Sequence, residues 1–134
     1  MGAFLAMLSL SESQDMVARS STSRTDSRGW EHWSHADEHF SLPKPWHQSL
    51  VCVLGMSRKM LNSVDNYIHQ YQNMGFIEYF FPSIAVHAKL SIMNPSTLRT
   101  IGFDQCVCDD VNNSNMNWFH PVKNQTHFRA DCGY

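Results

Sequence analysis

Hydrophobic residues between positions 57 and 75 recur with the spacing of an amphipathic helix. Six of them fall on one stripe, in the order Met60, Leu61, Val64, Tyr67, Ile68 and Tyr71. A helix with this pattern buries that stripe and exposes its opposite face. Ser57 is placed to cap the first turn, and Gly75 is placed to end the helix. The pattern therefore predicts one long helix over residues 57–75.

A second stripe with helical spacing follows directly. Its members are Ile77, Phe81, Ile84, Ala85 and Ala88. Proline is tolerated in the first turn of a helix but disrupts the interior. We therefore expect this second helix to begin near Pro82.

Two segments have the character of short buried strands. Residues 50–54 form an unbroken apolar run that ends at Gly55, and such runs suit a strand buried on both faces. Residues 103–107 are a second candidate, followed by a polar, Asn-rich loop at residues 109–117. Helices and strands together predict an α/β fold.

The N-terminal part of the chain has a different composition. A short apolar segment, residues 1–8, precedes residues 9–29, which contain seven serines, two threonines and mixed charges. Such a composition buries too little apolar surface to offset its ordering entropy, and it predicts a disordered linker. Residues 30–45 are expected to be an irregular lead-in that packs on the core. One domain then covers residues 30–134.

Composition and charge exclude two classes of partner. Hydrophobic residues make up 43% of the 134 residues, enough for a core, and the net charge of −2 provides no field that would attract nucleic acid. The apolar run at residues 2–10 is far shorter than the roughly 20 residues that a membrane span requires. We expect a soluble chain with no nucleic-acid partner and no membrane span.

Two separated segments resemble a known enzyme family. Residues 56–91, followed by the Phe-His-Pro-Val-Lys sequence at 119–123, are similar to the C-terminal half of nucleotide-sugar glycosyltransferases of the GT-A fold. The resemblance implies a partial GT-A-like α/β domain. It also implies transfer of a sugar from a nucleotide-sugar donor to a hydroxyl group of a glycan or other acceptor.

The resemblance assigns roles to three residues. Glu78 matches the acidic residue on the acceptor side, which acts as general base or holds the acceptor hydroxyl group. His120 matches the histidine that binds the divalent metal, Mn or Mg, and Lys123 matches the lysine on the diphosphate. These residue types fit the chemistry, because a departing nucleoside diphosphate develops negative charge that a metal and a cation stabilise. We expect the three side chains to meet at one concave surface.

One departure from the family limits this interpretation. The family holds its metal mainly through an Asp-x-Asp motif in the N-terminal half, whereas Asp109 and Asp110 lie downstream of the acceptor segment. The chain is therefore expected to lack the nucleotide-binding half and to be inactive on its own. The alternative is a non-catalytic α/β interaction or structural module, in which Glu78 starts a helix and His120 lies in a turn.

Two further patterns involve metal ligands. His35 and His39 belong to an H-x-x-E-H match, the signature of inverted zinc proteases, but that motif needs a helix, which Pro43 and Pro45 are expected to cut short. A set of three cysteines and one histidine has a spacing unlike that of a zinc finger: Cys106, Cys108, His120 and Cys132. With Cys52 included, the four cysteines allow three disulfide connectivities, which stay open.

Overall fold

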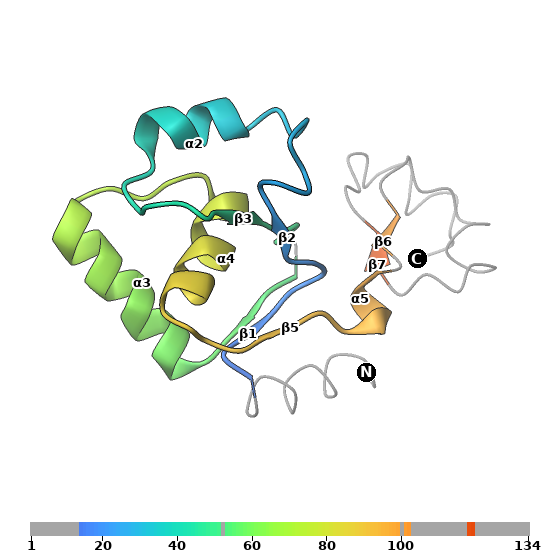
Figure 1. The fold of residues 1–134 in the computed structure, drawn as a ribbon. Coiled ribbons are helices and arrows are strands. Elements are labelled where there is room, and N and C mark those ends of the chain that lie inside the picture. Colours follow the sequence, from blue (N-terminus) through green and yellow to red (C-terminus); the bar gives the residue numbers. More distant parts are fainter. Residues whose placement is uncertain (1–13, 52, 100, 103–117, 120–134) are drawn as a thin grey trace, which may run out of the picture. The chain divides into compact units, whose positions relative to one another are not determined.

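The computed structural model describes residues 14–51, 53–99, 101–102 and 118–119 (Figure 1). The chain divides into two compact units, Met1–Pro95 and Ser96–Tyr134. The first unit contains, in order, β1 (Met16–Val17), β2 (Thr22–Ser23), α2 (Trp33–His39), β3 (His47–Gln48), β4 (Gly55–Met56), α3 (Arg58–Tyr71), α4 (Ile77–His87) and β5 (Ile92–Met93). The predicted mixture of helices and strands is confirmed.

The first unit has a two-stranded antiparallel sheet of β2 and β3, and a three-stranded sheet that is built around β1. The strand order is β4-β1-β5, with β1 antiparallel to β4 and parallel to β5. Met16 lies opposite both Met56 and Ile92, and the side chains of Met16, Val17 and Ala18 are fully buried. The expected disordered linker is therefore wrong for residues 14–29. The average composition of residues 9–29 gave no sign that three consecutive apolar residues, Met16, Val17 and Ala18, lie at the central strand of a sheet.

A short network around Asp15 joins this sheet to the helices. One carboxylate oxygen of Asp15 accepts the Ser57 hydroxyl at 2.9 Å, and the other accepts the Ser91 backbone N–H at 3.1 Å. These hydrogen bonds, that from Ser91 foremost, lower the pKa of Asp15. One side chain thus fixes the start of β1 to the beginning of α3 and to the segment before β5.

Helix α3 begins as the sequence predicts. The Ser57 hydroxyl accepts the Met60 backbone N–H at 3.1 Å, which makes Ser57 the N-cap. The helix ends at Tyr71, four residues before Gly75, because Gln72 adopts the left-handed conformation of a C-cap. The stripe is only partly internal: Met60 and Tyr67 are buried, whereas Leu61 is 54% exposed.

Helix α4 begins at Ile77 and contains Pro82, so the expected start near Pro82 is wrong. Proline has no N–H to donate to the carbonyl four residues earlier, that of Glu78. The Ser49 backbone N–H donates to this carbonyl instead, at 2.8 Å. One turn later, the buried Ser83 hydroxyl accepts the His47 N–H at 2.9 Å and donates to the His47 carbonyl at 3.1 Å. Residues 47–49, at and after β3, therefore bond to the Glu78 carbonyl, which lacks a partner within the helix because of Pro82, and to the Ser83 hydroxyl.

The apolar run at residues 50–54 is not a strand. Its described residues are partly exposed and irregular, and the strands β3 and β4 lie on either side of it. The backbone N–H of Ser49, just before this run, donates to the Glu78 carbonyl of α4 and not to a neighbouring strand. Hydrophobic periodicity alone could not reveal that a proline-containing helix would accept this hydrogen bond.

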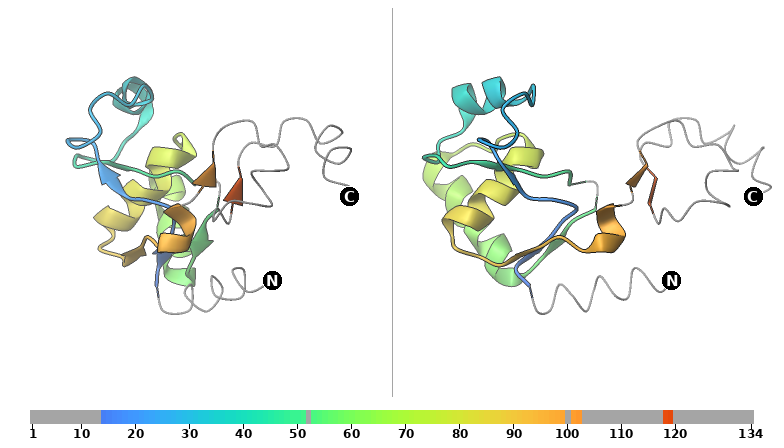
Figure 2. Two further views of the ribbon diagram at one scale, coloured as in Figure 1. Left: turned by 90° about the vertical axis from the view of Figure 1, so that its right-hand side faces the viewer. Right: turned by 45° about the vertical axis from the view of Figure 1, so that its right-hand side comes forward.

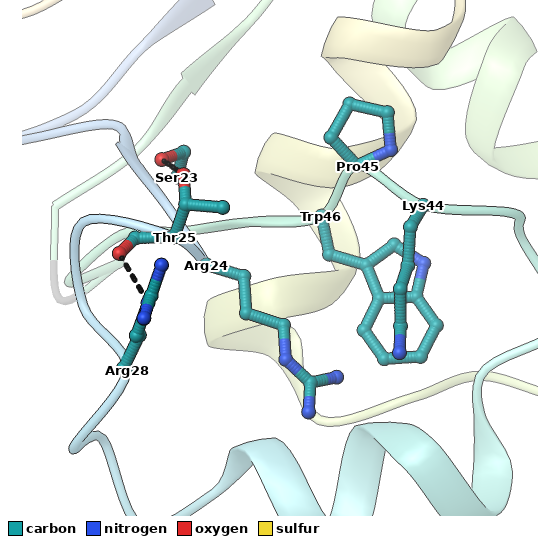
Figure 3. A pocket seen from close by; sticks show the side chains of 7 residues that line it. All are labelled: Ser23, Arg24, Thr25, Arg28, Lys44, Pro45 and Trp46. Atoms are coloured by element: carbon teal, nitrogen blue, oxygen red, sulfur yellow. Dashed lines mark hydrogen bonds between the residues drawn. The ribbon is translucent and has the colours of Figure 1, made fainter.

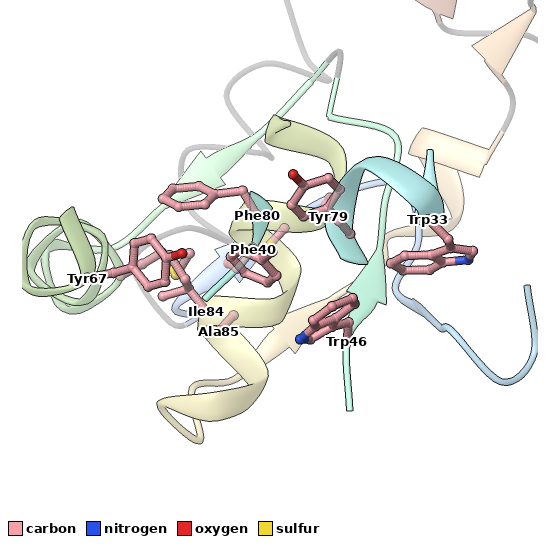
Figure 4. Packing of buried hydrophobic residues seen from close by; sticks show 12 residues of the cluster. Trp33, Phe40, Trp46, Tyr67, Tyr79, Phe80, Ile84 and Ala85 are labelled. Carbon is pink, nitrogen blue, oxygen red and sulfur yellow. The ribbon is translucent and has the colours of Figure 1, made fainter. Parts of the chain in front are cut away.

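An aromatic core fills the space between the helices (Figure 4). Phe40 lies at its centre, with ring centres 5.0 Å from Tyr79, 5.6 Å from Tyr67 and 5.6 Å from Trp46. Helix α4 lies beside α3 in both views of Figure 2. Residues of α4 contact residues of α3 and of β3. Residues 30–45 pack on the core as expected, but their middle part, residues 33–39, forms helix α2 where an irregular segment was expected.

The second unit contains helix α5 (Ser96–Arg99) and strands β6 (Ile101–Gly102) and β7 (Trp118–Phe119). The two strands pair in parallel, with Ile101 opposite Trp118. The predicted strand at residues 103–107 and the loop at 109–117 lie outside the described residues. None of the described helices has the length and apolar character needed to cross a membrane.

Candidate functional site

An open cavity of about 580 Å³ lies where β2 and its following turn meet the segment before β3 (Figure 3). We call it the Arg24 pocket. Its lining consists of Ser23, Arg24, Thr25, Arg28, Lys44, Pro45 and Trp46. Three of these seven side chains are cations, and the two contributing segments are about 20 residues apart in the chain. The fold therefore brings three positively charged side chains from two separate segments to one pocket.

The turn that carries two of these cations is held by serine hydroxyl groups. Ser23 Oγ donates to the Asp26 carboxylate at 2.5 Å, and the Ser23 carbonyl accepts the Ser27 N–H at 3.1 Å. The Ser27 hydroxyl donates to the same carbonyl at 2.8 Å. Serine-rich composition thus encodes a closed turn here, since such hydroxyl groups satisfy local backbone groups.

Arg24 is fixed on three sides. Its guanidinium donates to both Asp37 carboxylate oxygens, at 2.6 and 2.5 Å. Its central carbon lies 5.5 Å from the centre of the Trp33 ring and 5.2 Å from that of Trp46, within cation–π range. A paired and stacked guanidinium forms a rigid wall of the pocket.

Lys44 and Arg28 are less constrained than Arg24. The Lys44 ammonium lies 5.2 Å from the Trp46 ring centre and 3.3 Å from Asp37, with its side chain 61% exposed. Arg28 donates from Nε to the Thr25 carbonyl at 3.2 Å, and no ion pair among the described residues includes it. Both cations are therefore able to meet a ligand at the mouth of the pocket.

The pH dependence of this cluster gives a first testable prediction. Hydrogen bonds from Arg24, with a smaller contribution from Lys44, lower the pKa of Asp37 from 3.8 to about 2. Because the folded-state pKa is depressed, the stabilisation is complete above pH 4 and is lost as the pH falls from about 4 to about 2. Carbon-detected NMR titration of the carboxyl groups should show Asp37 titrating with a midpoint of about 2. An ordinary midpoint near 4 would show that the Arg24 pair does not persist in solution.

The three residues that the family resemblance singles out, Glu78, His120 and Lys123, are not among the lining residues of the Arg24 pocket. Glu78 lies in the first turn of α4, partly buried, and its backbone carbonyl accepts the Ser49 N–H. His120 and Lys123 lie outside the described residues, as do Cys52, Cys106, Cys108 and Cys132. Whether Glu78, His120 and Lys123 share one surface therefore stays a prediction.

The structure corrects the expectation for His35 and His39. Both residues lie on helix α2, which ends four residues before Pro43, so the prolines do not prevent the helix. The apolar residues Trp33, Ala36 and Phe40 mark its buried face, a helical spacing that the polar composition obscured. Within the described part of the chain, no three His, Cys, Asp or Glu side chains gather around a common metal position.

The Arg24 pocket was not expected from the sequence. Arg24 and Arg28 fall in the segment expected to be disordered, and Lys44 falls in the expected lead-in. The nearby tryptophans Trp33 and Trp46 are compatible with stacking on arginine, but their spacing does not show which cation they would meet. Comparison with known proteins adds no assignment: no family model, curated protein or solved structure matches this chain.

Proposed function

We propose that the unit Met1–Pro95 is a small non-catalytic α/β binding module whose Arg24 pocket takes a compact, phosphate-bearing anion. One observation carries this proposal: Arg24, Arg28 and Lys44 line a single open cavity and are positioned by the protein's own contacts. A preorganised site loses less conformational entropy when a ligand binds. This is the interaction-module alternative, with a ligand class attached to it.

The charges of the pocket favour an anion only moderately. The three cations are opposed by two nearby carboxylates, those of Asp26 and Asp37. Arg24 is already paired, so Arg28 and Lys44 are the groups that would contact the ligand first. A doubly charged phosphate group suits such an arrangement, because arginine and lysine both donate several hydrogen bonds to it.

The aromatic wall restricts the ligand further. Trp46 is 5% exposed, with both Arg24 and Lys44 within cation–π range of its ring. The ring is therefore covered and is not offered to a nucleobase for stacking. The volume of 580 Å³ lies within the usual range for small-molecule sites. Pyrophosphate or a simple phosphate monoester is the appropriate probe.

The lining of the pocket argues for binding rather than acid–base chemistry. Its described lining residues include no aspartate, glutamate, histidine or cysteine. General acid–base catalysis uses a group of that kind most often, and the one lysine of the lining, Lys44, lies 3.3 Å from the Asp37 carboxylate, an ion pair that favours its charged form. The residues present supply attraction, hydrogen bonds and shape.

Calorimetric titration with pyrophosphate tests the proposal. We expect Lys44→Gln and Arg28→Gln each to weaken binding about threefold to tenfold, since each removes one charge near the ligand. Asp37→Asn should strengthen binding by a similar factor of about three or more, because it removes an opposing charge and releases Arg24. Arg58→Gln is the matched control, as Arg58 is an exposed arginine at the start of α3 and away from the pocket lining. Equal affinities in all four variants would contradict the proposal.

The sugar-transferase hypothesis makes a different prediction in the same experiment. It requires Glu78, His120 and Lys123 to act with a divalent metal, so a nucleoside diphosphate should bind only when Mn²⁺ is present. Binding of that kind would be lost in His120→Ala and unchanged in Lys44→Gln. The reverse pattern supports the Arg24 pocket as the binding site.

A further inference from the structure

A second cavity, of about 510 Å³, lies between the C-terminal part of α2 and the connection from α3 to α4. Its lining includes His35, Glu38, His39, Asn73 and Met74. His35 and His39 are both exposed and are separated by one helical turn. Side chains four residues apart on a helix project from the same face. The two imidazoles are therefore able to act on one ligand.

The distance between the two rings suits a shared metal ion. Their centres are 4.5 Å apart and their planes are inclined at 57°. Two imidazoles bound to one ion through nitrogen–metal bonds of about 2.0–2.1 Å have ring centres about 5 Å apart. The observed separation of 4.5 Å is close to this value.

A hydrogen bond from the core positions the first ring. His35 Nδ1 lies 2.9 Å from the hydroxyl oxygen of Tyr79, whose side chain is fully buried. With Nδ1 donating to this oxygen, Nε2 carries the lone pair and is available to a metal. Such a partner on the second ring nitrogen is the usual way in which proteins orient a metal-binding histidine.

The surroundings of the second ring favour a cation. The Glu38 carboxylate lies 3.5 Å from His39 Nε2, which places a negative charge beside the second ring. Asn73 holds the neighbouring chain, because its amide donates to the Ser41 hydroxyl at 3.2 Å. The cavity is thus open, negatively charged on one side and supported by the α3–α4 connection.

We propose that His35 and His39 form a two-histidine chelating site for one divalent transition-metal ion. Since the described residues provide no third ligand of the His, Cys, Asp or Glu type at one point, water fills the remaining positions. Imidazole is a ligand for borderline transition-metal ions, so the site binds Cu²⁺ most strongly and Ni²⁺ and Zn²⁺ more weakly. Mg²⁺ and Ca²⁺ prefer oxygen ligands and do not bind. The site is independent of the Arg24 pocket and of the proposed function.

Titration of the full chain with Zn²⁺ and with Ni²⁺, followed by NMR of the histidine ring nitrogens, tests this site. We expect shifts at His35 and His39, with the His35 change at Nε2. His35→Asn and His39→Asn should each weaken this binding about tenfold or more, because a chelate becomes a single ligand. His69→Asn is the matched control, since His69 is an exposed histidine near the end of α3.

The variants also separate this site from any other histidine or cysteine in the chain. His39 is exposed, so His39→Asn should keep its fold by circular dichroism and tests the site on its own; His35→Asn also removes the hydrogen bond to Tyr79, so its fold is checked by the same measurement before its affinity is compared. Ring shifts confined to other histidines, or equal zinc affinity in the wild type, His35→Asn and His39→Asn, would overturn the proposal. Equal responses to Zn²⁺ and Mg²⁺ would also overturn it.

Discussion

Truncation of Phe80 to alanine should lower the free energy of unfolding by about 3–5 kcal/mol, the usual cost of removing a buried aromatic ring. Phe80 is fully buried on α4, with its ring centre 5.1 Å from that of Tyr67 and 6.0 Å from that of Phe40. Loss of the ring leaves a cavity between α3 and α4 that these neighbours cannot fill. Urea denaturation followed by tryptophan fluorescence measures the change.

The chain provides a matched control for this substitution. Phe76 lies one turn earlier, at the N-cap of α4, and is 38% exposed. Phe76→Ala removes the same atoms but should cost at most about 1–2 kcal/mol, because much of the ring is already in water. If the two variants lost equal stability, Phe80 would not be at the centre of the core.

Replacement of Gly75 by alanine should destabilise the unit by about 1–3 kcal/mol through overpacking. A Cβ atom at position 75 would lie 2.5 Å from Cε2 of the Tyr79 ring and 2.8 Å from its hydroxyl oxygen. Tyr79 is fully buried and bonded to His35, so its ring has little freedom to move away. Thermal unfolding monitored by circular dichroism measures the effect.

Gly29 is the control for the glycine substitution. No atom lies within 4 Å of a Cβ built at that position. Gly29→Ala should therefore leave stability within about 0.5 kcal/mol of the wild type, or raise it slightly by restricting the unfolded chain. Equal losses at positions 29 and 75 would mean that the close contact with Tyr79 is not what makes Gly75 necessary.

Local signals in the sequence were sufficient where one residue determines one feature. Ser57 caps α3 because a serine before an apolar stripe has a specific hydrogen-bonding role, and the structure shows that bond. The end of α3 at Gln72 could not be predicted, since both Gln72 and Gly75 are compatible with a helix end.

Long-range pairing explains the failures. Pro82 was expected to start a helix, but the Ser49 N–H satisfies the carbonyl that proline leaves open, and Ser49 is 29 positions earlier than Glu78. Likewise, Met16 is buried because β4 and β5 flank β1. Average composition over residues 9–29 carries no information about such partners.

The candidate sites also combine local features that the sequence shows with long-range contacts that it does not show. The i, i+4 spacing of His35 and His39 was visible in the sequence, whereas the helix that makes it meaningful was not expected. The Arg24 pocket depends on Asp37 and on two tryptophans that hold Arg24, so no local pattern could define it. Glu78 is placed by the structure, while its proposed partners His120 and Lys123 lie outside the described residues.

A proton–nitrogen NMR titration of the full chain with pyrophosphate tests the binding-module proposal most directly. The account predicts saturable shifts centred on residues 23–28 and 44–46, including the indole N–H of Trp46, and weaker binding in Lys44→Gln. Shifts that do not saturate, that are spread evenly over the unit, or that centre on the segment around Glu78 and require Mn²⁺ would contradict it.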